Sequence, residues 1–266
     1  MHGFPFDSES WEKQTRVLLA AGHRVIRYDR RGFGRSSRPA GGYDYDALAG
    51  DLATLLERLN ASDAVLVGAS VGTGEIIRYL GTRGSQRIRK AVLISTVAPA
   101  PLRSCDNPDG VEESMIEAAE AAVPADRPEW LSRFLDRAFD PGEPATARAG
   151  GGPATSRAGG RAATGRASDA ARQAAFITAA AAAPQAVSAS IEAWRSDFHG
   201  DLARIDVPVL LLHGDADRIL PIDATANRLP ELIGDLRFEV IPAGPHALNW
   251  VCPEQVNHHI LCFAAS

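Results

Sequence analysis

The hydrophobic pattern of the chain alternates between short apolar runs and longer segments with helical spacing. "RVIRYD" (24–29) is short and β-branched, and "DAVLVGAS" (63–70) is continuously apolar. Between them, the segment 45–60 carries leucines three and four residues apart. A continuous apolar run is typical of a strand buried on both faces, and spacing of this kind indicates an amphipathic helix. We therefore predict strands over 24–29 and 63–70 and a helix over 45–60.

The same alternation continues up to residue 97 and resumes at residue 207. The pattern predicts a helix over 71–84, strands over 88–97, 207–217 and 237–244, a helix over 222–232 and a last helix over 253–265. Strands separated by helices imply a mostly parallel sheet with helices on both faces. The predicted fold class is therefore α/β.

Residues 98–200 interrupt this rhythm and are mostly helical in pattern, with candidates at 115–122, 129–139 and 170–194. We predict a helical cap over 98–200, inserted into a core formed by 1–97 and 201–266. Inside the cap, 140–167 is a low-complexity stretch rich in Ala, Gly and Arg. We expect disorder there, because so little apolar surface cannot offset the entropy of ordering. A flexible basic lid and a translation-frame error are the alternative interpretations.

Composition narrows the function classes. The 266 residues carry a net charge of −5, which argues against a role on nucleic acid or at a membrane surface. The three cysteines are far apart and form no C-x-x-C pair, so we interpret them as reduced thiols. The sequence shows no signal segment and no apolar run of about 18 residues. We expect a cytoplasmic protein.

The pentapeptide Gly68-Ala69-Ser70-Val71-Gly72 lies where a predicted buried strand meets a predicted helix. The backbone must turn sharply there, and glycines two residues to either side remove side chains that would clash. This pattern is typical of a nucleophile elbow, which exposes the serine hydroxyl at the helix N-terminus. We predict Ser70 as the catalytic nucleophile. The simpler interpretation is a plain turn with Ser70 as an N-cap.

A catalytic serine needs a base that is itself oriented by an acid, and the chain order in such a fold is serine, acid, histidine. The turn after the predicted strand at 207 offers Asp215 and Asp217. We prefer Asp217, which lies past the sheet edge, and treat Asp215 as a solvated turn residue. His246 follows the last predicted strand and is the candidate base. His23, His258 and His259 are not placed to reach the serine, and we expect His213 to be structural.

An oxyanion hole needs two backbone N–H groups. Val71, directly after the nucleophile, supplies one of them. "HGFP" at the start of the chain fits a loop beside the nucleophile, and Phe4 N–H is its natural donor. Pro5 lacks an N–H and stiffens this loop.

Together, "GASVG", "HGDADRILP", "GPH" and "HGFP" resemble the α/β-hydrolase fold. The match is closer still to the cofactor-free bacterial haloperoxidases of that fold, also called perhydrolases or non-haem chloroperoxidases. The segments "SWEKQTRVLLAAGHRVIRYDRRGFGRSSRP" and "AVLVGASVGTGEIIRYL" are similar to that group. The resemblance covers 1–110 and 168–263 and fails across 140–167. Val71 stands where the family often has Met.

The resemblance implies a serine-triad enzyme that needs no metal, haem or other cofactor. Ser70 is acylated by a small ester or carboxylic acid, His246 is the general base, and Asp217 orients it. Phe4 and Val71 bind the oxyanion. Water then releases an acid, whereas hydrogen peroxide releases a peracid that oxidises halide. We expect a haloperoxidase or perhydrolase with carboxylesterase side activity.

Two rival interpretations stay open. One is a plain carboxylesterase or lactonase with the same triad, and the other is an inactive, truncated hydrolase-like protein. Small substrates and hydrogen peroxide are the expected partners, with no nucleic acid and no membrane, and a homo-oligomer is left open.

The start of the chain raises a separate expectation. In the resembled family, "HGFP" follows an inner strand between those matching 24–29 and 63–70, and two more strands precede it. We therefore expect an N-terminally truncated chain that lacks the first three family strands. Each unpaired buried backbone group costs about 1–3 kcal/mol. The sheet should then close up or be unstable, with Phe4 hanging from a free N-terminus.

Overall fold

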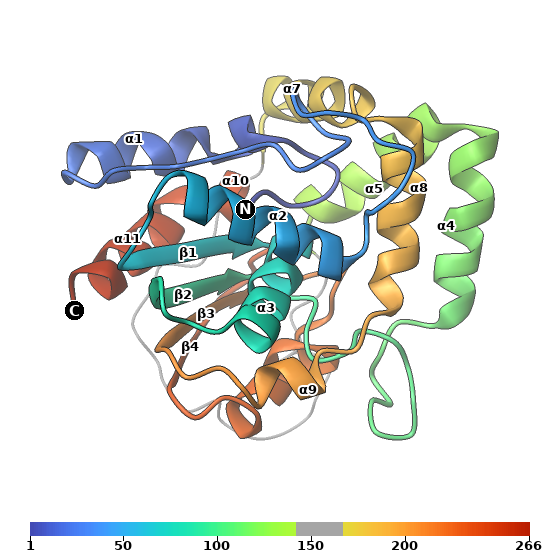
Figure 1. The fold of residues 1–266 in the computed structure, drawn as a ribbon. Coiled ribbons are helices and arrows are strands. Elements are labelled where there is room, and N and C mark those ends of the chain that lie inside the picture. Colours follow the sequence, from blue (N-terminus) through green and yellow to red (C-terminus); the bar gives the residue numbers. More distant parts are fainter. Residues whose placement is uncertain (142–166) are drawn as a thin grey trace.

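The computed structural model describes residues 1–141 and 167–266 and contains a parallel sheet (Figure 1). Its four strands are β1 (Ala64–Ala69), β2 (Ile88–Ile94), β3 (Val209–Gly214) and β4 (Leu236–Ile241), in the order β1-β2-β3-β4. All three pairings are parallel. Strands β2 and β3 are almost entirely buried, as expected of a sheet covered on both faces. The predicted α/β sheet is confirmed.

Helices cover both faces of the sheet (Figure 1). The helices α2 (Tyr45–Arg58) and α3 (Val71–Arg83) lie on one face, while α1 (Glu12–Ala20) and α11 (Pro253–Ala265) pack together on the other. Short helical segments complete the core: η1 (Ser8–Trp11), α9 (His199–Leu202), η3 (Ile222–Ala224), η4 (Ala226–Glu231) and α10 (Leu248–Val251). The helices predicted at 45–60, 71–84 and 253–265 are thus confirmed.

Between β2 and β3 the chain forms helices that lie beyond the carboxyl ends of the strands (Figure 1). They are α4 (Glu113–Ala125), α5 (Arg127–Phe139), α7 (Asp169–Ala180), α8 (Pro184–Glu192) and η2 (Ala193–Arg195). Asp126 caps α5, because its Oδ1 accepts from Glu129 N at 3.1 Å. The division into a core (1–97 and 201–266) and a cap (98–200) stays a prediction. The expected disorder over 140–167 falls almost wholly outside the described residues.

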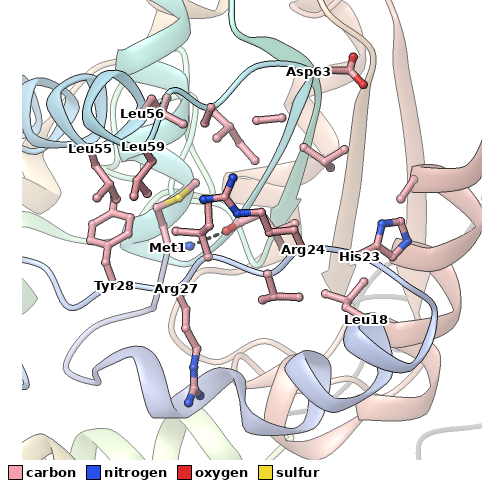
Figure 2. Close-up of a pocket in the computed structure, with 18 of the residues that line it drawn as sticks. Met1, Leu18, His23, Arg24, Arg27, Tyr28, Leu55, Leu56, Leu59 and Asp63 are labelled. Carbon is pink, nitrogen blue, oxygen red and sulfur yellow. Dashed lines mark hydrogen bonds between the residues drawn. The ribbon is translucent and has the colours of Figure 1, made fainter.

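The strand predicted over 24–29 is wrong. This segment is extended but belongs to no sheet, and Ile26 is 44% exposed. A cavity of about 410 Å³ separates it from β1, and residues of both segments line that cavity (Figure 2). Leu55 and Leu56 of α2 and its C-cap residue Leu59 form one wall (Figure 2). With no strand at bonding distance, the β-branched pattern of 24–29 has nothing to pair with.

The sheet has therefore not closed up in the way we expected, and Phe4 does not hang free. The Met1 ammonium donates to Val67 O at 2.6 Å, and Ala69 N donates to Met1 O at 3.2 Å. These two bonds are the pattern of a parallel bridge between Met1 and Gly68. The first residues thus extend alongside the end of β1. That the chain is N-terminally truncated and lacks the first three family strands stays a prediction.

Two helix predictions also need correction. The segment 222–232 forms two short 3₁₀ helices instead of one α-helix, since Thr225 leaves helical geometry and Pro230 lacks an N–H. The helix predicted over 170–194 is broken into α7 and α8, and Pro184 begins the second. No single helix in the described residues is long and apolar enough to cross a membrane. The pair 169–180 and 184–195 passes by length and composition together, but it is bent by 95°.

Candidate active site

Ser70 occupies a sharp turn between β1 and α3. Its φ of 52° lies in the left-handed region, where a non-glycine residue is strained. Ser70 N donates to Ile94 O at 2.9 Å, and Thr73 Oγ1 donates to Ser70 O at 2.6 Å. A Cβ on Gly68 would stand 2.4 Å from Gly72 O, and one on Gly72 would stand 2.6 Å from Met1 O. The strained turn therefore needs both flanking glycines.

The predicted acid and base meet Ser70 at the carboxyl edge of the sheet. His246 Nε2 lies 3.0 Å from Ser70 Oγ, and His246 Nδ1 lies 2.8 Å from Asp217 Oδ2. Ser70 follows β1, Asp217 follows β3 and His246 follows β4, so parallel strands deliver all three to one edge. All three side chains are buried. This chain of contacts lets His246 take a proton from Ser70 while Asp217 fixes the imidazole.

Asp217 is held as an anion. Burial alone would raise the pKa of its carboxyl, but the charge of His246 and hydrogen bonds from His213 and His246 lower that pKa well below its usual range. Oδ1 also accepts from Ile219 N and Leu220 N, each at 2.8 Å. His213 Nε2 donates to Leu220 O at 2.9 Å and lies 3.3 Å from Asp217 Oδ2. His213 thus braces the turn, in the place that we expected of it.

Asp215, the other candidate acid, has a different hydrogen-bond partner. Asp215 Oδ1 accepts from Ala243 N at 2.6 Å, which ties the turn after β3 to the loop after β4. Burial raises the pKa of the Asp215 carboxyl. His258 and His259 lie in α11 and His23 lines the cavity beside β1, so none of them faces Ser70. Within the described ranges, 1–141 and 167–266, no group of three or more His, Cys, Asp or Glu could hold a metal ion.

The two predicted oxyanion donors, Phe4 and Val71, belong to segments that adjoin Ser70. Val71 begins α3 directly after Ser70, and the loop of Phe4 passes beside it. A Cβ on Gly3 would stand only 3.5 Å from Ser70 Cβ, so this loop lies against the nucleophile. Among the described residues, neither the Phe4 nor the Val71 amide has a hydrogen-bond acceptor. Both amides are therefore free to donate to a substrate oxygen.

The Phe4 loop is anchored from two sides. The Phe4 ring is 2% exposed and packs edge-to-face on Phe33, Trp130, Phe134 and Trp194. These contacts join it to the cap helix α5 and to η2. Aromatic pairs of this kind contribute about 0.5–1.5 kcal/mol each beyond area burial. Helix α5 and η2 therefore pack directly against the loop of Phe4.

His2 also holds the Phe4 loop in place, through hydrogen bonds to Arg30 and Gly3. Its Nε2 accepts from Arg30 N at 3.0 Å, and its Nδ1 donates to Gly3 O at 2.9 Å. Arg30 and Glu75 are buried beside it, with Arg30 Nε 3.6 Å from Glu75 Oε2. Burial first, and then the charge of Arg30, hold the pKa of His2 well below its usual value. Our sequence analysis missed this cluster, because the buried charges are far apart in the chain.

Ser95 is a second residue that the sequence analysis missed. It follows β2, is 1% exposed, and its Oγ donates to His246 O at 2.7 Å. Ser95 N donates to Leu212 O at 2.9 Å, which fixes it against β3. Ser95 therefore positions the backbone of the histidine. Its place at the carboxyl end of a strand, like that of Ser70, is the signal that would have found it.

Ser70 opens onto a cavity of about 400 Å³ beneath the cap. Most of its walls are apolar: Val97, Pro101, Leu102, Val111, Met115, Ile116, Ala118, Ala119, Ala122, Trp130, Phe134, Trp194, Ile219 and Leu220. Arg133 and Arg137 complete the lining. Such a volume suits a small organic molecule. Apolar walls around a buried serine favour substrates with an apolar part.

Comparison with known proteins places the chain in a family. Residues 1–253 match the model of the alpha/beta hydrolase fold. A Synechocystis sp. protein, provisionally named a non-heme chloroperoxidase, is 46% identical over 99% of this chain and 89% of its own length. The non-heme haloperoxidase of Rhodococcus erythropolis is 35% identical, over 100% of this chain and 90% of that relative.

A solved structure agrees with these relatives. The bromoperoxidase of Bacillus anthracis superposes with a TM-score of 0.87 and 35% identity, covering 100% of this chain and 90% of that one. The sequence motifs, the fold and the relatives all indicate the same family. The chain belongs to the α/β-hydrolase fold family, in its group of non-heme haloperoxidases.

Proposed function

We propose that this protein is a serine-triad acyl-transfer enzyme, a perhydrolase with carboxylesterase activity. The observation that carries the proposal is the contact chain from Ser70 through His246 to Asp217, opening onto the apolar cavity. Ser70 Oγ attacks the acyl carbon as His246 Nε2 takes its proton, and Asp217 stabilises the imidazolium. The Phe4 and Val71 amides donate to the oxyanion. His246 then returns the proton to the leaving alcohol, or to the hydroxyl lost from a carboxylic acid.

The second half of the cycle decides between hydrolysis and perhydrolysis. His246 deprotonates water to release a carboxylic acid, or hydrogen peroxide to release a peracid. A peracid and a halide ion then give hypohalous acid and the carboxylate in solution. A relative in Acinetobacter calcoaceticus, 30% identical over 100% of this chain, is named a bifunctional esterase/perhydrolase. That name supports proposing both activities for this protein.

The test begins with Ser70. A fluorophosphonate probe should label the folded wild-type protein and not the S70A variant, since the probe reacts with an activated serine. The wild type should hydrolyse p-nitrophenyl acetate. With hydrogen peroxide, acetate and bromide it should also brominate monochlorodimedone. Folded wild type that is neither labelled nor active would refute the proposal.

Hydrolysis without bromination favours the plain carboxylesterase or lactonase. Failure of labelling favours the inactive hydrolase-like protein.

Cytoplasmic location, hydrogen peroxide as co-substrate and a homo-oligomeric state are further proposals. Gel filtration of the purified chain tests the last of these.

A further inference from the structure

The cap helix α5 presents one face to the cavity of Ser70. Trp130, Arg133, Phe134 and Arg137 all line that cavity. Their spacing of three and four residues puts them in a single stripe along the helix. This stripe of α5 therefore presents two aromatic rings and two cations to the cavity of Ser70.

The charge in this cavity has one sign. The described residues that line it include Arg133 and Arg137 but no Asp or Glu. Arg133 Nε donates to Glu129 Oε1 at 2.7 Å, so a carboxylate on its own helix partly offsets its charge. Arg137 has no carboxylate within 4 Å in the part of the chain that the structure describes. Among the described residues that line the cavity, Arg137 is therefore the cation without a carboxylate partner.

Arg137 is also held in place. Its Nη2 donates to the backbone oxygen of Arg218 at 3.1 Å, and Arg218 directly follows Asp217. This bond fixes the guanidinium relative to the turn that carries the catalytic acid. Arg137 is exposed as a whole, but partial desolvation of its head group, and then the charge of Arg218, lower the pKa of its guanidinium. A guanidinium has five N–H donors, so others remain for a ligand.

We propose that the cavity takes acyl groups that end in a second, anionic carboxylate, and that Arg137 binds that carboxylate. This inference rests on the proposed acyl-transfer function and names its substrate class. The apolar walls hold the methylene chain between the two ends, and the guanidinium matches the planar carboxylate. Half-esters of linear dicarboxylic acids have this form.

The chemistry adds no new step to the proposed cycle. The half-ester acylates Ser70 Oγ, and the alcohol leaves with the proton carried by His246. Water then attacks the acyl carbon, and the products are the dicarboxylate and the free serine. The distal carboxylate is unchanged throughout, so it contributes only through binding.

The experiment compares two p-nitrophenyl esters of adipic acid, one with a free distal carboxylate and one with it methylated. The measured quantity is the ratio of their kcat/KM values. We expect the wild type to prefer the free acid, and R137Q to lower the ratio about tenfold, mainly through KM. R137K should restore part of the preference. R16Q, which removes an exposed cation from α1, should leave the ratio unchanged.

Other outcomes overturn the inference. A ratio near one in the wild type, or an equal loss on both esters in R137Q, would mean that Arg137 only ties the cap to the turn of Asp217. A preference that R16Q removes as well would reflect net charge alone. Failure of the proposed function looks different, because the wild type would then hydrolyse neither ester and Ser70 would not label.

Discussion

At the scale of single residues, the two aspartates after β3 have different contacts and should have different tasks. Asp217 contacts His246 Nδ1 at 2.8 Å, whereas Asp215 accepts from Ala243 N at 2.6 Å. An amide at 217 cannot stabilise the imidazolium and favours the wrong tautomer. D217N should therefore lower kcat for p-nitrophenyl acetate by about 10⁴-fold.

The matched variant for this prediction is D215N. Its side-chain oxygen can still accept from Ala243 N, and it touches no part of the contact chain. We expect kcat within about threefold of wild type, together with a loss of unfolding free energy of about 1 kcal/mol as a charged acceptor becomes neutral. If instead D215N lost activity and D217N kept it, our choice between the two carboxylates would be reversed.

His2 gives a second prediction at this scale, on pH. Its imidazole is buried and neutral in the folded protein, with a pKa well below the ordinary 6.5, which it regains on unfolding. Below pH 6.5 the unfolded chain therefore binds a proton that the folded chain does not, so the stability present above pH 6.5 is lost as pH falls toward the folded pKa. Between pH 7.5 and 5.5 the titration of this group alone should lower the free energy of unfolding by on the order of 1 kcal/mol.

H2Q should flatten the pH dependence of the unfolding free energy by about that amount, measured by urea unfolding at the two pH values. H258Q, at an exposed position on α11, is the control and should leave the slope as in wild type. Equal slopes in wild type and H2Q would show that the buried imidazole is not the group that titrates.

At the scale of elements, the turn between β1 and α3 is the most constrained part of the site. A Cβ on Gly68 would meet Gly72 O at 2.4 Å, and the main chain cannot yield without moving Ser70. G68A should reduce the unfolding free energy by about 1–3 kcal/mol. It should also lower kcat/KM about 10²-fold by displacing the hydroxyl.

Thermal unfolding and p-nitrophenyl acetate kinetics measure both effects. G200A, in α9, is the control, because nothing lies within 4 Å of the added methyl group. It should keep full activity and gain stability by up to about 1 kcal/mol from helix propensity. A fully active G68A would mean that the turn is looser than its geometry indicates.

The elements also show what the sequence could reveal. Strand β3 is buried throughout and β1 is only partly buried, but both are largely apolar runs, so the local pattern sufficed to predict them. The segment 24–29 has the same residue types, yet whether it becomes a strand depends on a neighbour far away in the chain. The meeting of Ser70, Asp217 and His246 was predictable because each follows a strand, and their catalytic roles stay predictions. His2 is joined to Arg30 by buried contacts between segments far apart in the chain, and no local pattern marks those contacts.

At the scale of the whole molecule, the sheet leaves one side of β1 without a strand. β1 is an edge strand of the sheet, and the cavity of about 410 Å³ lies between it and the segment 24–29 (Figure 2). Met1 is bonded in parallel register beside Gly68, at one end of this space. Burial lowers the pKa of its ammonium to about 5, so a charge at this point is unfavourable at neutral pH. The cavity therefore has the position, walls and register to accept one more parallel strand.

This geometry makes a last prediction. A six-residue segment of Val, Ile and Thr fused directly before Met1 should pair with β1 and contact the leucines of α2. It should raise the unfolding midpoint by about 2–4 °C for each kcal/mol gained. A Gly-Ser extension of equal length also removes the ammonium from its place at Val67 O, but it offers no side chains to the cavity. The apolar extension should therefore stabilise more than the Gly-Ser extension. If both raise the midpoint equally, the gain comes from moving the charge, and the space beside β1 is not a site for a strand.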